Sequence, residues 1–174
     1  GYISYFNVVK SKDFISSPYN RRSDTLAKRV TRGKILDKRG KVLAQTTTSA
    51  DGSETREYPY GREFAHVVGY TAKGKYGLES RMNSELLSSN AFFLEKLTNE
   101  FQDKKNPGDN VVTTLDVKLQ RAAYDALGDR KGAVVAMDPK TGKVLAMVSK
   151  PDFNPETVED KWQTLNTDSS ARLL

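Results

Sequence analysis

The sequence predicts an α+β fold, in which an elongated module of antiparallel hairpins with short helices is followed by one helix and a β-hairpin. In the first half, short apolar arms flank turn residues at several places, which is typical of hairpins. Two stretches, 78–102 and 117–127, carry apolar residues at helical spacing. The stretch from Gly132 to Lys150, GAVVAMDPKTGKVLAMVSK, then predicts two strands joined by a tight turn.

The composition is that of a globular chain and excludes several kinds of site. The chain has 174 residues, 37% of them hydrophobic and 29% charged, and it contains no apolar run long enough to cross a membrane. The absence of cysteine excludes disulfides and thiolate catalysis. The single histidine, His66, has no second imidazole with which to share a metal. We therefore expect no metal or cofactor and assign His66 a structural or surface role.

Positive charge is concentrated near the N-terminus. Residues 1–45 hold eleven Lys and Arg against three Asp and Glu, a net charge of +8, whereas residues 46–174 hold seventeen against nineteen, a net charge of −2. The basic quarter could bind nucleic acid or an anionic membrane surface, and a plain solvated face is equally open. Its clusters match no zinc finger, RRM or KH signature, which counts against nucleic acid. The apolar opening GYISYFNVV is either a first strand or the outer end of a membrane anchor.

Two hairpins are predicted before residue 60. In ILDKRGKVLA, Asp37 opens a turn and Gly40 supplies a positive φ, with an apolar arm on each side. The pair Asp51-Gly52 marks a second turn between two threonine-containing arms that can pair. The next stretch, residues 58–80, alternates turn glycines with short apolar runs, so we expect it to wrap irregularly on the core.

Two short helices are predicted next. The apolar positions at a spacing of four are Leu78, Met82 and Leu86, then Phe93, Leu97 and Phe101. DKKNPGDN follows and has the composition of a linker, because Pro107-Gly108 prevents a helix from continuing. We expect a domain boundary there, which divides the chain into residues 1–110 and 111–174.

The second part begins with VVTTLD, a predicted strand whose Asp116 is placed to cap a helix over residues 117–127 that ends at Gly128. The helix is expected to turn an apolar stripe toward the core, formed by Leu119, Ala122, Ala123 and Ala126.

Both faces of the last hairpin are apolar. If its arms alternate simply, one face carries Val135, Met137, Leu145 and Met147, and the other carries Val134, Ala136, Val144, Ala146 and Val148. One helix can cover only one face, so we expect the other to be covered by elements outside this sequence. The open sheet edge also makes a homodimer or strand exchange an expectation.

Five stretches carry a resemblance to a known family. In order they are TRGKILDKRGKVLA, YPYGREFAHVVGY, YGLES, PGDNVVTTLDVKLQRAAYDAL and KGAVVAMDPKTGKVLAMVSKPDFNP. They resemble the N-terminal pedestal or dimerisation-type module and the first part of the transpeptidase domain of class B penicillin-binding proteins, especially the penicillin-binding protein A type. The likeness covers about residues 30 to 174.

The resemblance implies a parent protein with one N-terminal membrane helix and its bulk on the extracytoplasmic face of the bacterial membrane. Such a parent is a serine D,D-transpeptidase that cross-links peptidoglycan stem peptides and is acylated by β-lactams. Its pedestal would hold the transpeptidase domain away from the membrane and meet other cell-wall synthesis or division proteins. The alternative kept open is a basic domain that binds nucleic acid or anionic membranes and has no enzymatic role.

The catalytic motif of that family is absent from this chain. The nucleophile lies in Ser-x-x-Lys, and no lysine here has a serine three positions before it. Ser88-Ser89-Asn90 and Lys140-Thr141-Gly142 match the letters of the two other motifs, but one breaks a helical stretch and the other is a hairpin turn. We therefore expect no catalytic residue and a sequence that ends before the catalytic serine.

Nine residues match the family's N-terminal motifs and are expected to be structural, at the junction of the two modules. They are Arg32, Gly33, Asp37, Gly40, Pro59, Gly61, Gly69, Gly77 and Glu79. The glycines allow turns and close backbone approach. An ion pair between Arg32 and Glu79 is expected to tie two segments together, the alternative being two independent surface charges.

Overall fold

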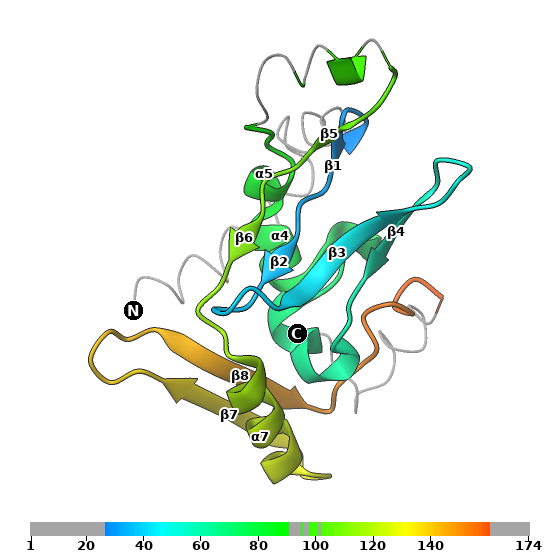
Figure 1. Cartoon of the computed structure of the whole chain (residues 1–174). Coiled ribbons are helices and arrows are strands. Elements are labelled where there is room, and N and C mark those ends of the chain that lie inside the picture. Colours follow the sequence, from blue (N-terminus) through cyan, green and yellow to red (C-terminus); the bar gives the residue numbers. More distant parts are fainter. Residues whose placement is uncertain (1–26, 91–94, 96–97, 101, 161–174) are drawn as a thin grey trace.

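A computed structural model describes residues 27–90, 95, 98–100 and 102–160. It has the expected α+β architecture, with a small sheet and short helices above a helix that packs on a separate hairpin (Figure 1). The expectations for residues 1–9, for most of the second predicted helix and for the end of the chain lie outside the described residues. Within them, no helix is long and apolar enough to cross a membrane.

The central sheet has four strands in the order β4-β3-β2-β6. Their bounds are β2 (Ile35–Leu36), β3 (Val42–Thr48), β4 (Glu54–Glu57) and β6 (Val111–Val112). Strands β2, β3 and β4 form the two predicted antiparallel hairpins, with positive φ at Gly40 and Gly52 in the turns. Strand β6 pairs with β2 in parallel, so the end of the sheet is closed by a strand far away in the sequence.

The predicted linker is part of the fold. Strand β5 (Asn106–Pro107) pairs in parallel with β1 (Val30–Thr31), and Gly108 N donates to Thr31 O at 2.7 Å. The linker interpretation was wrong because proline and glycine break helices but do not exclude an edge strand. A side chain at Gly108 would meet Leu86 O at 2.1 Å, so glycine serves here for close backbone approach.

Short helices build the rest of the first part. They are η1 (Gly61–Phe64), α3 (Ala65–Val68), η2 (Ala72–Gly74), α4 (Gly77–Arg81) and α5 (Asn83–Leu86). One core cluster joins the hairpins, these helices and the start of the next helix; its buried members are Ile35, Leu43, Ala44, Tyr58, Phe64, Val68, Leu86, Leu115 and Val117. The expected irregular segment is thus mostly helical turns anchored by apolar side chains.

Helix α7 (Val117–Leu127) starts as predicted. The Asp116 side chain accepts from Lys118 N at 2.9 Å and from Leu119 N at 3.4 Å. The predicted apolar stripe was wrong, because Leu119 is 42% exposed, and Ala122 and Ala126 are exposed as well. The buried residues of the helix are Val117 and Gln120, since the glutamine amide has backbone partners inside.

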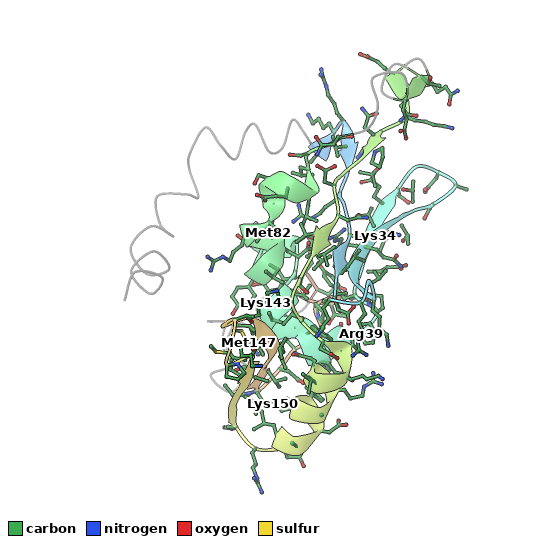
Figure 2. All side chains as sticks on the ribbon, turned by 60° about the vertical axis from the view of Figure 1, so that its left-hand side comes forward. Lys34, Arg39, Met82, Lys143, Met147 and Lys150 are labelled. Atoms are coloured by element: carbon green, nitrogen blue, oxygen red, sulfur yellow. The ribbon has the colours of Figure 1, made fainter. Side chains whose placement is uncertain are left out.

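Strands β7 (Gly132–Met137) and β8 (Val144–Lys150) form the last hairpin. Ala146 and Val148 are buried on the face toward α7, η1 and α3. On the other face Val135, Met137 and Met147 are 51%, 56% and 37% exposed. Met147 is labelled in Figure 2. The described residues therefore cover one face of the hairpin, as predicted, and leave the other open.

Gly69 offers a test of close backbone packing. An ideal Cβ there would lie 2.0 Å from Tyr76 O, and its φ of 80° and ψ of −147° belong to a region that only glycine populates readily. We expect Gly69→Ala to lower the free energy of unfolding by at least about 3 kcal/mol, measured by urea denaturation.

Gly40→Ala is the matched control, because its φ is +83° but nothing lies within 4 Å of the added Cβ. It should cost only about 1–2 kcal/mol, the strain of a left-handed alanine. Equal losses in the two variants would contradict the packing around Gly69.

Candidate functional site

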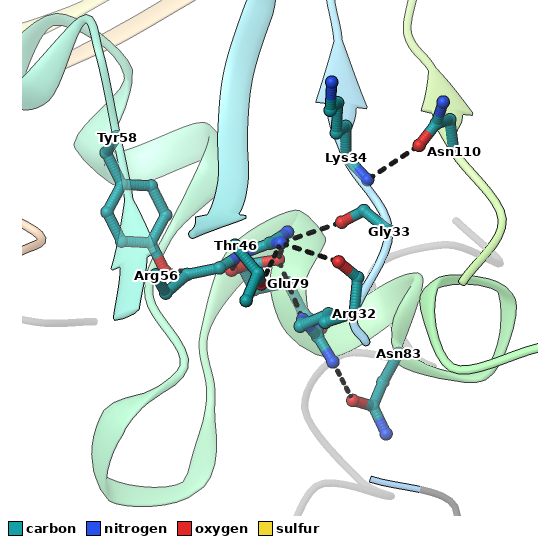
Figure 3. Close-up of polar contacts among 9 residues, drawn as sticks. All are labelled: Arg32, Gly33, Lys34, Thr46, Arg56, Tyr58, Glu79, Asn83 and Asn110. Carbon is teal, nitrogen blue, oxygen red and sulfur yellow. Dashed lines mark hydrogen bonds and ion pairs between the residues drawn. The ribbon is translucent and has the colours of Figure 1, made fainter. Parts of the chain in front are cut away.

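Two arginines and one glutamate form a buried cluster in the first part of the molecule (Figure 3). Arg32 follows β1, Arg56 lies in β4, and Glu79 lies in the first turn of α4. The side chain of Glu79 is fully buried, and those of Arg32 and Arg56 are 10% and 8% exposed. Three segments that are distant in sequence therefore meet at one carboxylate.

The carboxylate of Glu79 is shared by three donors. Arg56 binds it with two nitrogens, Nε to Oε2 at 2.9 Å and Nη2 to Oε1 at 2.8 Å. Arg32 Nε donates to Oε1 at 3.2 Å, so the expected Arg32–Glu79 ion pair is present. The Tyr58 hydroxyl donates to Oε2 at 2.8 Å. Such charge-assisted, bidentate contacts fix direction as well as distance.

The remaining guanidinium donors bind backbone, hydroxyl and side-chain amide oxygens. Arg56 Nη1 donates to Gly33 O at 2.8 Å and to Thr46 Oγ1 at 3.1 Å, and Arg32 Nη1 donates to Asn83 Oδ1 at 2.6 Å. The cluster thus holds the segment after β1 against β3, β4 and the short helices. Buried arginines need this saturation, because an unmet donor away from water is costly.

Burial and the neighbouring charges act in opposite directions on the pKa values of Glu79 and Arg32. Burial by itself raises the pKa of Glu79, but the hydrogen bonds and charges of Arg56 and Arg32 outweigh it and hold that pKa below its usual value. Burial lowers the pKa of Arg32 in spite of Glu79, and burial beside Glu79 raises the pKa of Tyr58. At neutral pH the cluster holds two cations, one anion and a neutral phenol.

Gly33 lets this segment lie against the chain that leads into β6. A Cβ at Gly33 would lie 1.9 Å from Asp109 O. Gly33 N donates to Leu86 O at 2.9 Å, and Lys34 N donates to Asn110 Oδ1 at 2.9 Å. The glycine next to Arg32 is therefore required by packing rather than by a turn.

Asp37 connects the first hairpin to α7. It is 1% exposed, and its Oδ1 accepts from Arg39 N at 2.9 Å and Lys41 N at 2.8 Å within its own turn. Its Oδ2 accepts from Val117 N at 3.2 Å, eighty residues further along the chain. One carboxylate therefore shapes a turn in the first part and binds the N-terminus of the helix in the second.

Gln120 makes a second connection and is fully buried. Its Nε2 donates to Glu63 O at 2.6 Å and to Met147 O at 2.8 Å, while its Oε1 accepts from Met147 N at 2.9 Å. The amide thus occupies the place of a neighbouring strand at the edge of β8, where Leu145 O also accepts from Asp116 N at 2.8 Å. This edge of the hairpin is closed by α7 and linked to η1.

Further polar contacts hold the segment after β8 to the first part. Glu156 Oε1 accepts from Tyr58 N at 3.0 Å, His66 Nε2 lies 2.7 Å from Pro151 O, and Arg62 pairs with Asp152 at 3.0 Å. His66 therefore has a structural contact, as expected. The junction contains interactions from the turn of β2–β3, from η1 and α3, and from α7 and β8.

The predicted residues do not all belong to these contacts. Arg32, Gly33 and Glu79 meet in the cluster, and Asp37 lies at the junction, whereas Pro59 is exposed after β4 and Gly61 begins η1. Lys140-Thr141-Gly142 forms the exposed β7–β8 turn, and Ser88-Ser89-Asn90 follows α5. Within the described residues no three His, Cys, Asp or Glu side chains gather to hold a metal ion.

Among the residues of these contacts that the sequence reasoning missed are Arg56, Tyr58, Asn83 and Gln120. For Gln120 the sequence held a signal. Val117, Gln120 and Tyr124 follow one another at spacings of three and four, so Gln120 lies on the same helix face as Val117 and Tyr124. For Arg56, one charged residue among others in the run ETRE, there was none.

Two family models match the chain. Residues 32–111 match the penicillin binding protein A dimerisation domain, and residues 132–171 match the penicillin binding protein transpeptidase domain. The cluster, the central sheet and the short helices lie within the first match, and the hairpin β7–β8 lies within the second.

Curated relatives and solved structures agree with these matches. The peptidoglycan D,D-transpeptidase PbpA of Mycolicibacterium smegmatis is 32% identical over 176 residues, which cover 88% of this chain and 36% of that protein. The peptidoglycan D,D-transpeptidase MrdA of Escherichia coli K12 is 31% identical over 140 residues, 63% of this chain and 22% of that protein. The chain thus spans about a third or less of the length of these relatives.

Among solved structures, the imipenem acyl-enzyme complex of penicillin-binding protein A from M. tuberculosis has a TM-score of 0.72 and 30% identity, over 86% of this chain and 38% of that one. The D,D-transpeptidase domain of a peptidoglycan glycosyltransferase from Eggerthella lenta has a TM-score of 0.67 and 38% identity, over 83% and 32%. Fold and sequence therefore point to one family.

Glu79 should contribute to the acid sensitivity of the chain. Its folded pKa is below the usual 4.5, so its contribution to stability is complete above that pH and is lost as the pH falls through the folded pKa. At pH 7, Glu79→Gln leaves two buried guanidinium groups without an anion and should cost about 3–5 kcal/mol in urea denaturation. The difference from the unmodified chain should shrink in acid.

Glu85→Gln removes the same charge from an exposed position on α5 and serves as the control, with an expected change within about 0.5 kcal/mol. If the cost of Glu79→Gln does not depend on pH, or matches that of the control, the cluster does not have the role described.

Gln120→Met should loosen the hairpin from the helix. The substitution keeps the approximate side-chain volume but leaves Met147 N, Met147 O and Glu63 O without the partner they have in the structure. A loss of at least about 2 kcal/mol is expected, together with faster hydrogen exchange at the Met147 amide. Unchanged exchange at Met147 would argue against the contact.

Proposed function

The chain belongs to the class B penicillin-binding proteins, and from this premise we propose that it is the non-catalytic N-terminal part of a peptidoglycan D,D-transpeptidase. Residues 1 to about 110 form the pedestal or dimerisation-type module, and residues 111–174 begin the transpeptidase domain. The pedestal positions the transpeptidase domain outside the membrane. The parent protein is the enzyme, and this part of it supports the enzyme without taking part in acyl transfer.

The observation that supports the proposal is the attachment of α7 and the hairpin to the first part of the molecule. Asp37 binds the N-terminus of α7, and the buried Gln120 joins α7, β8 and η1 through three hydrogen bonds of its side chain. Side chains held by saturated, buried polar contacts have one arrangement available to them. The orientation of the first sheet therefore determines the orientation of the hairpin on which a larger domain would be built.

The unpaired edge and the exposed face of the hairpin also support its role as the start of a larger domain. Among the described residues β7 pairs only with β8. Val135 lies opposite Met147, whose backbone groups point away from β7, so the N–H and C=O of Val135 point to the outer edge of β7. This edge and the exposed face with Met137 are where further strands and helices of the transpeptidase domain would add. A second copy of this chain could pair along the same edge, and such pairing would produce the expected homodimer or strand exchange.

The location and partners that we propose are those of the parent protein. The M. smegmatis relative is named a peptidoglycan transpeptidase, and the M. tuberculosis structure is an acyl-enzyme with imipenem. By analogy the parent acts on peptidoglycan stem peptides, binds β-lactams, and is anchored with its bulk on the extracytoplasmic side of the bacterial membrane. The pedestal surface is offered to other cell-wall synthesis or division proteins.

Labelled penicillin tests the assignment of roles. The present chain should form no covalent adduct, because it has no serine three residues before a lysine. A version extended along its gene through the next Ser-x-x-Lys should give a stoichiometric adduct on that serine, read by intact-mass spectrometry. An adduct on the present chain, or a folded extended chain that stays unlabelled, would overturn the proposal.

A further inference from the structure

Residues 151–160, which follow β8, return to the first part of the molecule and pack on it; we call them the clasp segment. Phe153 and Val158 of this segment are 2% and 0% exposed, and they share one core cluster with Ala65 and Tyr70. The rings of Phe153 and Tyr70 meet edge to face, with their centroids 5.7 Å apart. The clasp segment lies within the transpeptidase match and these partners lie within the dimerisation-domain match, so the two matched regions touch here as well as at α7.

Tyr58 joins the clasp segment to the arginine cluster through two different groups. Its backbone N–H donates to Glu156 Oε1 of the clasp segment at 3.0 Å, and its hydroxyl donates to Glu79 Oε2 of the cluster at 2.8 Å. Tyr58 itself is 5% exposed and belongs to the core cluster that also holds Ile35 and Leu43. A displacement of this one residue therefore changes both contacts together.

The two ends of this connection differ in their surroundings. Glu79 is fully buried and is also bound by both arginines of the cluster, whereas Glu156 is an exposed residue of the clasp segment. A buried, saturated carboxylate holds its partners in one arrangement more firmly than an exposed one does. The cluster therefore sets the position of the Tyr58 N–H group, and the clasp segment attaches where that group points.

We propose that Tyr58 is a positioning residue that sets the rate at which the serine of the parent transpeptidase is acylated, because it fixes the clasp segment on the pedestal. This inference rests on the proposed function, in which the catalytic serine follows the present chain. The clasp segment is the last described stretch before that serine, so a clasp segment that shifts on the pedestal would shift the chain that carries the nucleophile. A displacement of about 1 Å at a reacting group can slow a reaction about a hundredfold. Tyr58 acts through Glu156 and touches no reacting atom.

The contact itself is tested on the present chain by hydrogen exchange at the amide of residue 58, followed by NMR. Glu156→Ala removes the acceptor and should speed this exchange at least about tenfold, whereas Glu156→Gln keeps an acceptor oxygen and should leave it nearly unchanged. Tyr58→Phe should also speed it, because the ring is no longer bonded to Glu79. Glu159→Ala, which truncates another exposed glutamate of the clasp segment, is the control and should have no effect.

The role in the reaction is tested on the chain extended to the end of its gene, at a temperature at which circular dichroism shows every variant folded. The acylation rate is measured against the concentration of labelled penicillin, which separates the dissociation constant of the first complex from the rate constant of acylation. Tyr58→Phe and Glu156→Ala should lower the rate constant at least about threefold and leave the dissociation constant unchanged. Glu156→Gln should restore the rate constant, a rescue that a purely structural role would not require.

Tyr60→Phe is the control for the lost hydroxyl, because Tyr60 lies two positions away and packs its ring edge-on against Phe64 at 5.8 Å. It should acylate at the rate of the unmodified chain. If the extended chain is labelled at one rate in all variants, the positioning role of Tyr58 is overturned and the proposed function stands. If no extended chain is labelled, the proposed function and the role of Tyr58 are overturned together. Equal exchange at residue 58 in Glu156→Ala and the unmodified chain would overturn the contact on which the inference depends.

Discussion

The first part of the molecule depends on one buried carboxylate. Glu79 is fully enclosed and balances the guanidinium of Arg56 through two nitrogens and that of Arg32 through one. Because desolvating three charges is expensive, the arrangement is stable only when every donor has an acceptor, which forces the segment after β1, strand β4 and α4 into one geometry. A buried ion cluster of this kind selects one arrangement of the chain more than it adds to the free energy of folding.

One aspartate and one neutral glutamine amide connect this part of the molecule to α7 and the hairpin. The residues Asp37 and Gln120 are each bonded to two parts of the chain that are far apart in sequence. The core cluster that runs from the hairpins to Leu115 and Val117 fills the space between these bonds. In a class B penicillin-binding protein, this continuity would let a module without catalytic residues determine where the transpeptidase domain lies.

Much of the fold could be predicted from the sequence because each of its short local patterns is compatible with few backbone conformations. Turn residues such as Gly40 and the cap Asp116 specify backbone geometry within a few positions, and the structure has both. Long-range pairing leaves no such signal, so the two parallel strand pairs and the inclusion of Pro107 in β5 were not foreseen. The buried face of α7 was mistaken because hydrophobicity ranks leucine above glutamine, whereas the position of Gln120 is decided by backbone groups that only the folded chain supplies.

The central claim is that the sheet and the hairpin behave as one cooperative body, so the most direct measurement is native-state hydrogen exchange in increasing urea. Amides of the central strand β3 and of β8 would be followed in the same samples by NMR. The account predicts that both exchange with the same free energy of opening, equal to that of global unfolding. If β8 and α7 open at a lower free energy while β3 remains protected, the polar junction does not couple the two parts and the account is contradicted.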